Sequence, residues 1–483
     1  MAFIGPHAHK TRCTAHRNGI RCRQTRYDDS GKPRRQYTTF SILPRVRARF
    51  ASGKGSTYLH DLAVYSDLTW DTDEHQFCDW SSGAIHRDLR AKGLFDDPRH
   101  DAYIISVDGA QFIDKRSSSG WIVMLTALNS SHFERFRHSQ TVIPTVIPGP
   151  NNPVDLDSFL FPILQQFARA AQGHWIWDGA KEEWFLWRAW IVAAAADQQG
   201  SSKINHMTGP TGFCGCKTCH MKANYAYDGQ HVGYFPLTTV NGAARSRDRP
   251  RSYDPRNLPH RTDNSYAEDL AEVAGTLTAA EHREARRVTG VGERPLLCFS
   301  PAFTMPTFFP PDVFHLFGSN VPSLLWSTFT NHQDGDPFTL SEEQQELFAS
   351  MLESSGSDLP TSFSASKPRD SCTNSNSHYK MFEWSLVTYL YLPYFLYAID
   401  APLPVVKMVC DLTEGVRLAM SSDGVLAPDL QNMEDRFVDF VEAWERLYVR
   451  RQPHLLSRAT ISIHQLLHIS DFVYAHGSPR NTS

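Results

Sequence analysis

The chain has 483 residues, 41% of them hydrophobic and 12% aromatic, with a formal net charge of −4. This length and composition exclude a chain that is disordered throughout, and they predict two or more structural units. There is no run of 18 apolar residues, and the first residues carry Pro and charge where a secretory signal needs an apolar stretch, so we expect no membrane span and an intracellular protein.

Residues 1–54 form a basic leader. They contain 13 Lys and Arg against two Asp and have few large apolar residues. Such a segment can contact nucleic-acid phosphates by releasing counterions. Charge alone favours the simpler interpretation, a solvated leader, and we expect residues 1–54 to be disordered.

Residues 55–200 carry the pattern of a mixed α/β core. β-Branched apolar runs at Ala102–Phe112 and Trp121–Asn129 predict two strands, and a third follows before the turn "IPGPNNP". Leu156–Gln172 is an amphipathic helix. The apolar run Trp184–Gly200 favours a buried strand in its second half, although its alanines leave a helix open.

Residues 201–378 are expected to form a mixed insertion. The part from 205 to 260 is loop-like and rich in cysteine and Pro, residues 265–288 predict one helix, and residues 353–378 are a Ser-rich linker. The remaining residues, 379–483, show repeated helical patterns and predict a helical C-terminal part.

Two acids end apolar runs. Asp108 closes the first predicted strand and is followed by Gly109, and Asp197 closes the run before the insertion. Carboxylates at neighbouring strand ends can share divalent cations, which activate water for attack on phosphorus. Pattern alone favours plainer roles, because Asp-Gly is a common hairpin signal and Asp197 is a typical helix cap or loop acid.

A cysteine pair and a histidine pair have the spacing of metal ligands. Cys216 and Cys219 form a C-x₂-C motif, which is half of a zinc site, and His464 and His468 lie one turn apart on a predicted helix. Together they make a Cys₂His₂ set that would hold structural Zn²⁺. The alternatives are unliganded thiols and two half-buried histidines, and the latter is favoured when the histidine pair is taken alone.

Three other groups are weaker candidates. Asp312 and His315 are spaced as a metal pair, but a capping Asp explains them equally well. Glu383 opens a predicted helix, where an acid suits the helix dipole. A basic, Pro-rich loop offers arginines that could contact phosphates, although a solvated loop is the simpler interpretation: Arg245, Arg247, Arg249 and Arg251.

Three stretches occur together, in order, in a known protein family. They are "SVDGAQF", "VIPGPNNPVDLDSFL" and "RSYDPRNLPHRTDNSY", followed late in the chain by "TISIHQLLHISDFV". With them the chain resembles the fungal transposases of the CACTA (En/Spm) superfamily, over roughly Tyr58 to Gly477. Each stretch is weak alone, but the ordered set is specific.

The resemblance implies an α/β fold, a ribonuclease H-like catalytic core interrupted by a mixed insertion, with a helical C-terminal part. In this family three carboxylates hold two Mg²⁺ or Mn²⁺ ions. Asp108 matches the first acid, and Asp197 matches the second, although "DQQG" replaces the usual Asp-x-Pro-Ala context. The family's zinc ligands match the cysteine and histidine pairs named above.

The third acid of the family lies in a Glu-Arg motif after the histidine pair, and this chain stops at "YAHGSPRNTS". We therefore expect the C-terminal part to be truncated, with Glu383 as the only well-placed helical substitute. A missing acid leaves enzymatic activity open, since losing one metal-binding carboxylate usually abolishes cleavage.

The sequence thus predicts a transposase-derived DNA-binding protein of the DDE/D type. Its ancestral activity would be metal-dependent DNA cleavage and strand transfer at transposon ends, inactive or truncated in this chain. We expect it in the nucleus, bound to DNA, without a membrane, and as a homo-oligomer. The alternative is a non-catalytic, zinc-stabilised remnant that binds DNA or protein.

Overall fold

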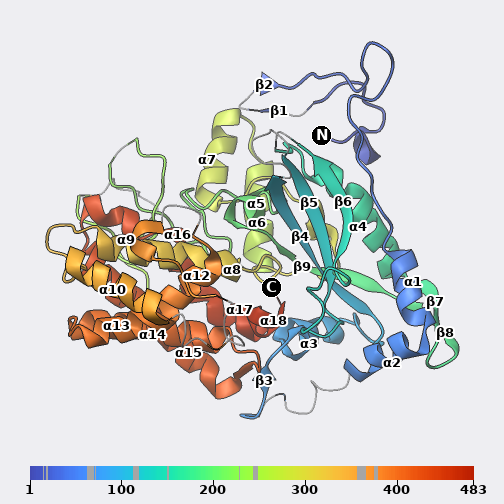
Figure 1. Cartoon of the computed structure of the whole chain (residues 1–483). Helices are drawn as coiled ribbons and strands as arrows, with labels where there is room; N and C mark the ends of the chain where they lie inside the picture. Colours follow the sequence, from blue (N-terminus) through green and yellow to red (C-terminus); the bar gives the residue numbers. More distant parts are fainter. Residues whose placement is uncertain are drawn as a thin grey trace.

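The structure is a computed structural model that describes residues 1–482 apart from 15, 18–19, 63–69, 71, 112–118, 150–151, 228, 243–248, 356–359, 361–365 and 375–378. A sheet from the first half of the chain stands beside a group of helices from the second half (Figure 1). None of the helices in the described part is long and apolar enough to cross a membrane.

The centre of the first half is a four-stranded sheet in the order β6-β5-β4-β9. The first three strands form an antiparallel meander, and β9 pairs with β4 in parallel after a connection that contains a long helix. The three predicted strands, the predicted helix and the strand favoured in the second half of the 184–200 run are confirmed. Their bounds are β4 (Asp101–Gln111), β5 (Ser119–Ala127), β6 (Val142–Pro148), α4 (Asp157–Gln172) and β9 (Ala189–Ala195).

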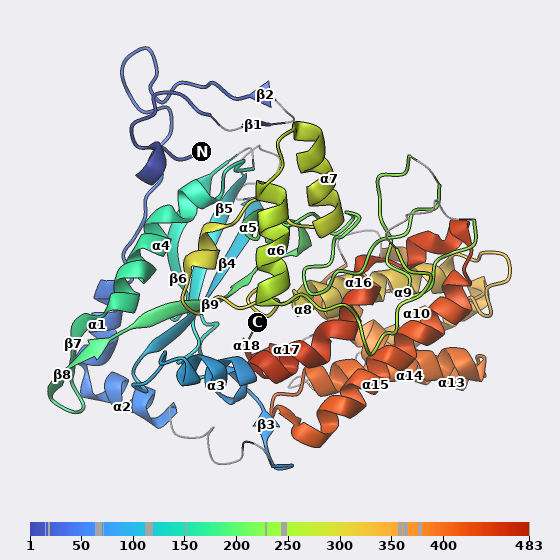
Figure 2. The same cartoon turned by 180° about the vertical axis from the view of Figure 1, so that it is seen from behind.

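Both faces of this sheet are covered, because side chains of β4 alternate between two buried clusters. Tyr103, Ile105 and Val107 share a cluster with α1, α4 and α6, and Figure 2 shows α4 and α6 over this face. Ala102 and Ile104 share the other cluster with α3 and α17. These helices are α1 (Leu43–Ala51), α3 (Ala84–Ala91), α6 (Asp263–Ala274) and α17 (Ile469–His476).

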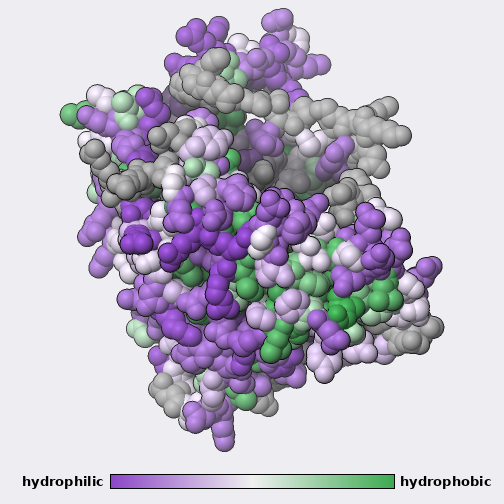
Figure 3. Space-filling model, turned by 90° about the vertical axis from the view of Figure 1, so that its left-hand side faces the viewer, coloured by the Kyte–Doolittle hydropathy of each residue, from purple (hydrophilic) through white to green (hydrophobic). Residues whose placement is uncertain are grey.

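The C-terminal residues are helical, as predicted, and their core includes the insertion. Phe213, Met221 and Phe235 of the insertion belong to the same buried cluster as Phe437 and Trp444 of the C-terminal helices. On the side formed by these helices the surface is mostly hydrophilic, with one patch of apolar residues (Figure 3). Besides α17, helices of the C-terminal part include α12 (Met381–Leu386), α13 (Leu392–Ala398), α14 (Leu403–Ala419), α15 (Ala427–Trp444), α16 (Ile461–Gln465) and α18 (Pro479–Thr482). Two helices of the insertion, α9 (Val321–Thr330) and α10 (Glu342–Ser354), contribute to the same core.

The basic leader differs from the expectation of disorder over residues 1–54. Residues 43–51 form α1, and Ile42, Val46 and Phe50 are buried against the sheet. The physical reason is a short apolar stripe, since residues four apart lie on one face of a helix. The arginines between them obscured this stripe in the composition.

The predicted helix at 265–288 is two helices, α6 and α7 (Ala279–Thr289). Thr278 caps α7, where its side chain accepts from the Glu281 N–H while the Glu281 carboxylate accepts from the Thr278 N–H. This capping box starts a new helix inside a stretch whose periodicity appeared continuous. A small hairpin at the far edge of the molecule, β7 (His174–Asp178) and β8 (Glu183–Trp187), packs against α1.

Candidate functional site

Asp108 lies in β4, and Asp197 lies at the matching position two residues after the end of the neighbouring parallel strand β9. In the β4–β9 pair Ser106 is opposite Ala195, and each acid follows two residues later. The carboxyl ends of parallel strands meet at one edge of a sheet, so both carboxylates reach the same region. Burial and the Asp197 carboxylate raise the pKa of Asp108, as expected for like charges that lie close together.

A third acid, Asp312, reaches the same edge from a later segment. The Ala194 N–H donates to the Phe308 carbonyl at 2.8 Å, so the chain before Asp312 runs beside the end of β9. The hydrogen bond with Asp312, and then the charges of Asp197 and Asp108, raise the pKa of His315. The structure therefore brings together the two predicted metal acids and the weaker Asp312–His315 pair.

Two of these acids also cap helices. Asp197 accepts from the Gly200 N–H at the start of α5 (Gln198–Ile204), and Asp312 accepts from the His315 N–H at 3.1 Å at the start of α8 (Val313–His315). The plainer interpretation of both residues thus holds as well. A carboxylate has two oxygens and about four lone-pair sites, so a cap leaves capacity for a cation.

Glu383 is held elsewhere by an ion pair. Its side chain is 2% exposed, and its Oε2 lies 2.6 Å from the Arg369 guanidinium. Burial alone would raise the pKa of Glu383, but the hydrogen bonds from Arg369 and from the Lys380 N–H outweigh burial and lower it to about 2. The side chains that act most strongly on Asp108 are instead Asp197, His315 and Asp312.

The cysteine and histidine pairs meet in the interior of the molecule. Cys216, Cys219, His464 and His468 are all buried, and their ligand atoms lie within 4.8 Å of one another. Sγ of Cys219 is 3.2 Å from Nε2 of His464, and the two Nε2 atoms are 3.2 Å apart. This convergence of two thiols and two imidazoles, contributed by parts of the chain far apart in sequence, matches the donor set and number of a tetrahedral zinc site.

Electrostatics within this cluster fit a metal-ligand set. Burial raises the pKa of both thiols, but for Cys216 the hydrogen bond with Cys219 and the nearby imidazoles outweigh it and hold the pKa well below its usual value. Metal ligands bind as thiolates, so a thiol that ionises readily favours binding.

The surroundings of the cluster orient its ligands. Arg261 is buried and donates to the Cys216 carbonyl at 3.2 Å and to Sγ of Cys214 at 3.2 Å. Nδ1 of His468 lies 3.9 Å from an Asp471 carboxylate, which is too far for a hydrogen bond. His220 pairs with Asp269 at 2.9 Å, and Asp269 also pairs with Arg261.

The arginines of the basic loop divide into two kinds. Arg249 is partly buried and donates to the carbonyls of Lys222, Pro236 and Pro250, which makes it a structural residue. Arg251 is exposed. Arg245 and Arg247 lie outside the described residues.

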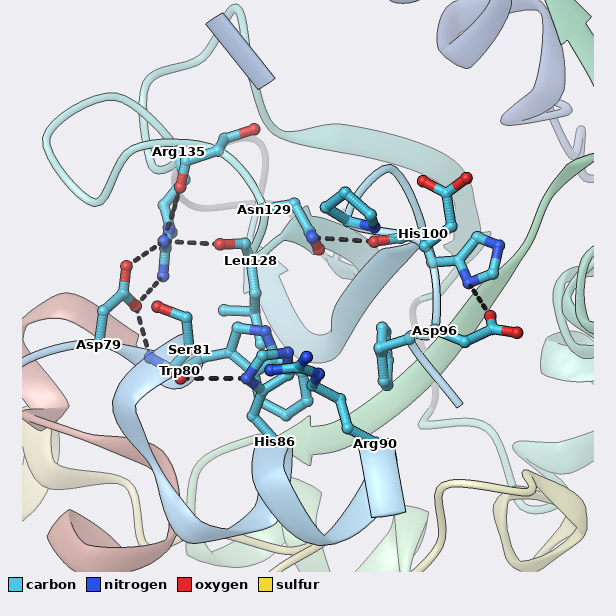
Figure 4. Close-up of a pocket in the computed structure, with 14 residues that line it drawn as sticks. Asp79, Trp80, Ser81, His86, Arg90, Asp96, His100, Leu128, Asn129 and Arg135 are labelled. Atoms are coloured by element: carbon cyan, nitrogen blue, oxygen red, sulfur yellow. Dashed lines mark hydrogen bonds and ion pairs between the residues drawn. The ribbon is translucent and has the colours of Figure 1, made fainter. Parts of the chain in front are cut away.

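A separate pocket lies at the opposite end of β4 (Figure 4). Its buried Arg135 donates to Asp79 at 2.6 and 2.7 Å and to three backbone carbonyls, and His100 lies 3.1 Å from Asp96. At about 3.3 Å per strand residue, roughly 20 Å separates this pocket from Asp108. Its charged groups hold the sheet, α3 and the end of the chain together.

One residue of the site escaped the sequence-based reasoning. Lys217, between the two cysteines, is 8% exposed, and its ammonium donates to the Pro310 carbonyl at 2.7 Å and to the Ser201 hydroxyl at 3.2 Å. A lysine inside a C-x₂-C loop is usually solvated, so no sequence signal distinguishes a buried one.

One family model matches part of the chain. Residues 83–239 are similar to a transposase family. The matching family is described as the transposase family tnp2. The match includes Asp108, Asp197 and both cysteines of the cluster, whereas Asp312 and the two histidines follow it. No curated protein is similar enough to the chain to count as a match.

Proposed function

We propose that this protein is a transposase-derived DNA-binding protein whose acids at the sheet edge bind divalent cations for DNA cleavage. The observation that carries the proposal is the parallel pairing of Ser106 with Ala195, because Asp108 and Asp197 each follow two residues later. Both acids lie in the segment that matches a transposase family, which supports the proposal. The order β6-β5-β4-β9, a meander joined by a parallel strand, supports a ribonuclease H-like core.

Asp108, Asp197 and Asp312 would hold the cations. Carboxylate oxygens are the ligands that Mg²⁺ and Mn²⁺ prefer, and crowding of negative charge at this edge favours a cation over three free carboxylates. A divalent cation held by these residues would lower the pKa of bound water, and later of a 3′-hydroxyl, for in-line attack on phosphorus. His315, hydrogen-bonded to Asp312, fixes the direction of that carboxylate.

The first test is nicking of supercoiled plasmid by the purified chain with Mn²⁺ or Mg²⁺, beside Asp108→Asn. We expect metal-dependent nicking that the variant loses by at least about a hundredfold, since transition-state stabilisation by bound metal is lost with its ligand. Glu383→Gln is the matched control and should retain nicking when folded. Equal nicking by wild type and Asp108→Asn would show that the activity is a contaminant.

We also propose that the four-residue cluster holds one structural Zn²⁺. Two sulfurs and two imidazole nitrogens favour zinc over the oxygen-preferring cations of the sheet edge. With four protein ligands no position is open to substrate, so zinc stabilises the junction between the insertion and the C-terminal helices and takes no part in catalysis.

A second candidate function is a non-catalytic, zinc-stabilised remnant that binds DNA or protein. The ion pair between Glu383 and Arg369 favours this second candidate. Glu383 was the expected substitute for the family's third acid, and in this ion pair it is not free to bind a catalytic cation. This candidate predicts DNA binding that falls with salt, one zinc per chain and no nicking. Nicking in the first test therefore decides between the two candidates.

The family, the cellular location and the oligomeric state that we propose rest on the sequence stretches shared, in the same order, with a known transposase family. We propose that the chain belongs with the fungal CACTA (En/Spm) transposases, acts in the nucleus where its DNA substrate lies, and works as a homo-oligomer, because transposases join two element ends. Exposed Arg251 is the described loop arginine available to phosphates.

A further inference from the structure

One side chain connects the cysteine cluster to the segments that carry two of the acids at the sheet edge. Lys217 lies in the loop between Cys216 and Cys219, so both ends of its short segment belong to the cluster. Its ammonium donates to Pro310, two residues before Asp312, and to Ser201, which lies in the helix that Asp197 caps.

The loop that carries Lys217 is fixed independently of that ammonium. The buried Arg261 donates to the Cys216 carbonyl, and its own N–H donates to the Thr218 carbonyl at 2.9 Å. On the other side, Gln198 of α5 donates to Ser462 at 3.2 Å and to Gln465 at 3.0 Å, both in the helix of His464. The backbone around Lys217 is therefore held in place, and its side chain extends from there to the two segments that carry Asp197 and Asp312.

We propose that Lys217 is a positioning residue that sets the spacing of Asp197 and Asp312 for divalent-cation binding. By bonding to both acid-bearing segments at once, it holds the chain around Pro310 against α5. This inference rests on the proposed cation site, and it goes beyond it by linking that site to the zinc cluster.

A buried lysine near carboxylates can also have the opposite effect and weaken the binding of a cation. An ammonium close to carboxylates repels a second cation and neutralises part of the charge that would bind it. If Lys217 acts only as a counter-charge, removing the ammonium should tighten cation binding. If it positions the acids, removing it should weaken binding, so the two roles differ in sign.

The test is a titration of the zinc-loaded full chain with Mn²⁺, in which electron paramagnetic resonance measures free Mn²⁺ and elemental analysis measures zinc. We expect Lys217→Met to bind Mn²⁺ about tenfold more weakly than wild type, the size typical of losing a residue that orients metal ligands, with zinc content unchanged. Ser201→Ala removes one of the two acceptors and should weaken binding in the same direction but by less.

Lys222→Met is the matched control, because Lys222 comes from the same loop region and its ammonium donates to the Val288 carbonyl instead. It should bind Mn²⁺ as wild type does. Mn²⁺ affinity in Lys217→Met that equals or exceeds wild type overturns the positioning role. Absence of Mn²⁺ binding by the wild-type chain overturns the cation site itself, and with it this inference. If Lys217→Met fails to fold, Ser201→Ala replaces it: weaker Mn²⁺ binding than wild type supports the positioning role, and equal or tighter binding overturns it.

Discussion

At the residue scale, two of the acids proposed to bind cations also cap helices. Asp197 and Asp312 each close the first turn of a helix and still face the space beside Asp108. Caps are fixed by backbone N–H groups, so the direction of such a carboxylate is set before any ligand arrives. Binding sites gain from this, since less freedom is lost when the ligand binds.

The residue-scale prediction concerns zinc. We expect wild type to contain one zinc per chain and Cys219→Ser to contain none, with a large fall in unfolding temperature, because structural zinc contributes on the order of 10 kcal/mol in small zinc domains. Elemental analysis and calorimetry measure both quantities.

Cys214→Ala provides the control for that experiment. Cys214 is fully buried in the same loop, but its Sγ accepts from Arg261 and lies outside the ligand set. The variant should keep its zinc. Zinc in Cys219→Ser, or none in wild type purified without chelator, would mean that the cysteines are free thiols.

At the element scale, a partly buried acid connects the insertion to the C-terminal helices. Glu445 begins the π-helical turn η7 (Glu445–Val449), and its carboxylate accepts from the N–H groups of Leu237 and Thr238. Burial raises the pKa of Glu445 to about 7, although those two hydrogen bonds and the Arg249 charge lower it in part. The folded chain therefore keeps the Glu445 proton to a higher pH than the unfolded chain does.

This shift predicts a pH dependence of stability. The unfolded chain releases the Glu445 proton near its ordinary pKa of 4.5 and the folded chain near 7, so between these values the folded state binds more protons. The free energy of unfolding should then fall as pH rises from about 5 to about 7, by at most about 3 kcal/mol. Urea unfolding across this range measures the change.

Glu445→Gln should remove most of this slope, because its amide oxygen still accepts a hydrogen bond but carries no charge. Glu442→Gln, an exposed acid on the preceding helix, should keep the wild-type slope. Parallel slopes for wild type and Glu445→Gln would show that other groups control the dependence.

How far the sequence predicts the structure also depends on the element. Strands such as β4 and β9 are apolar runs of ordinary length, and they were predicted correctly because burial on both faces leaves a continuous signal. The cysteine and histidine pairs lie together, as expected from the four ligands that tetrahedral zinc requires, and zinc binding itself stays a prediction. α1 was missed because its few apolar residues are a weaker signal than the many basic residues around them. The break between α6 and α7 was missed because a capping box is a weaker signal than a helical periodicity that continues across it.

Within the site, the acids were predicted in part. Asp108 and Asp197 were proposed as residues at strand ends, but β4 continues to Gln111, so Asp108 lies inside its strand and only Asp197 follows the end of one. The approach of Asp312 depends on how a later segment packs beside β9, and that information is spread over the whole fold. The interior place of Lys217 and the Glu383–Arg369 pair are long-range or loop contacts of the same kind.

At the scale of the whole molecule, the insertion joins the sheet to the C-terminal helices. Its hydrophobic residues share a core with those helices, and its cysteines reach histidines more than two hundred residues later. The predicted boundaries at 201 and 379 thus divide the sequence, but the hydrophobic core includes residues from both sides of residue 379. Loss of zinc should consequently disturb the acids as well as the helices.

The central claim, that Asp108, Asp197 and Asp312 form one cation site, is tested most directly by cleavage of the polypeptide with bound iron. Fe²⁺ replaces Mg²⁺ at carboxylate sites, and with ascorbate and peroxide it generates radicals that cut the backbone close to the ion. For the zinc-loaded chain we predict cuts near residues 108, 197 and 312, all suppressed by excess Mg²⁺ and by Asp108→Asn. Cuts that avoid these three segments, or that persist unchanged in Asp108→Asn, would contradict the claim.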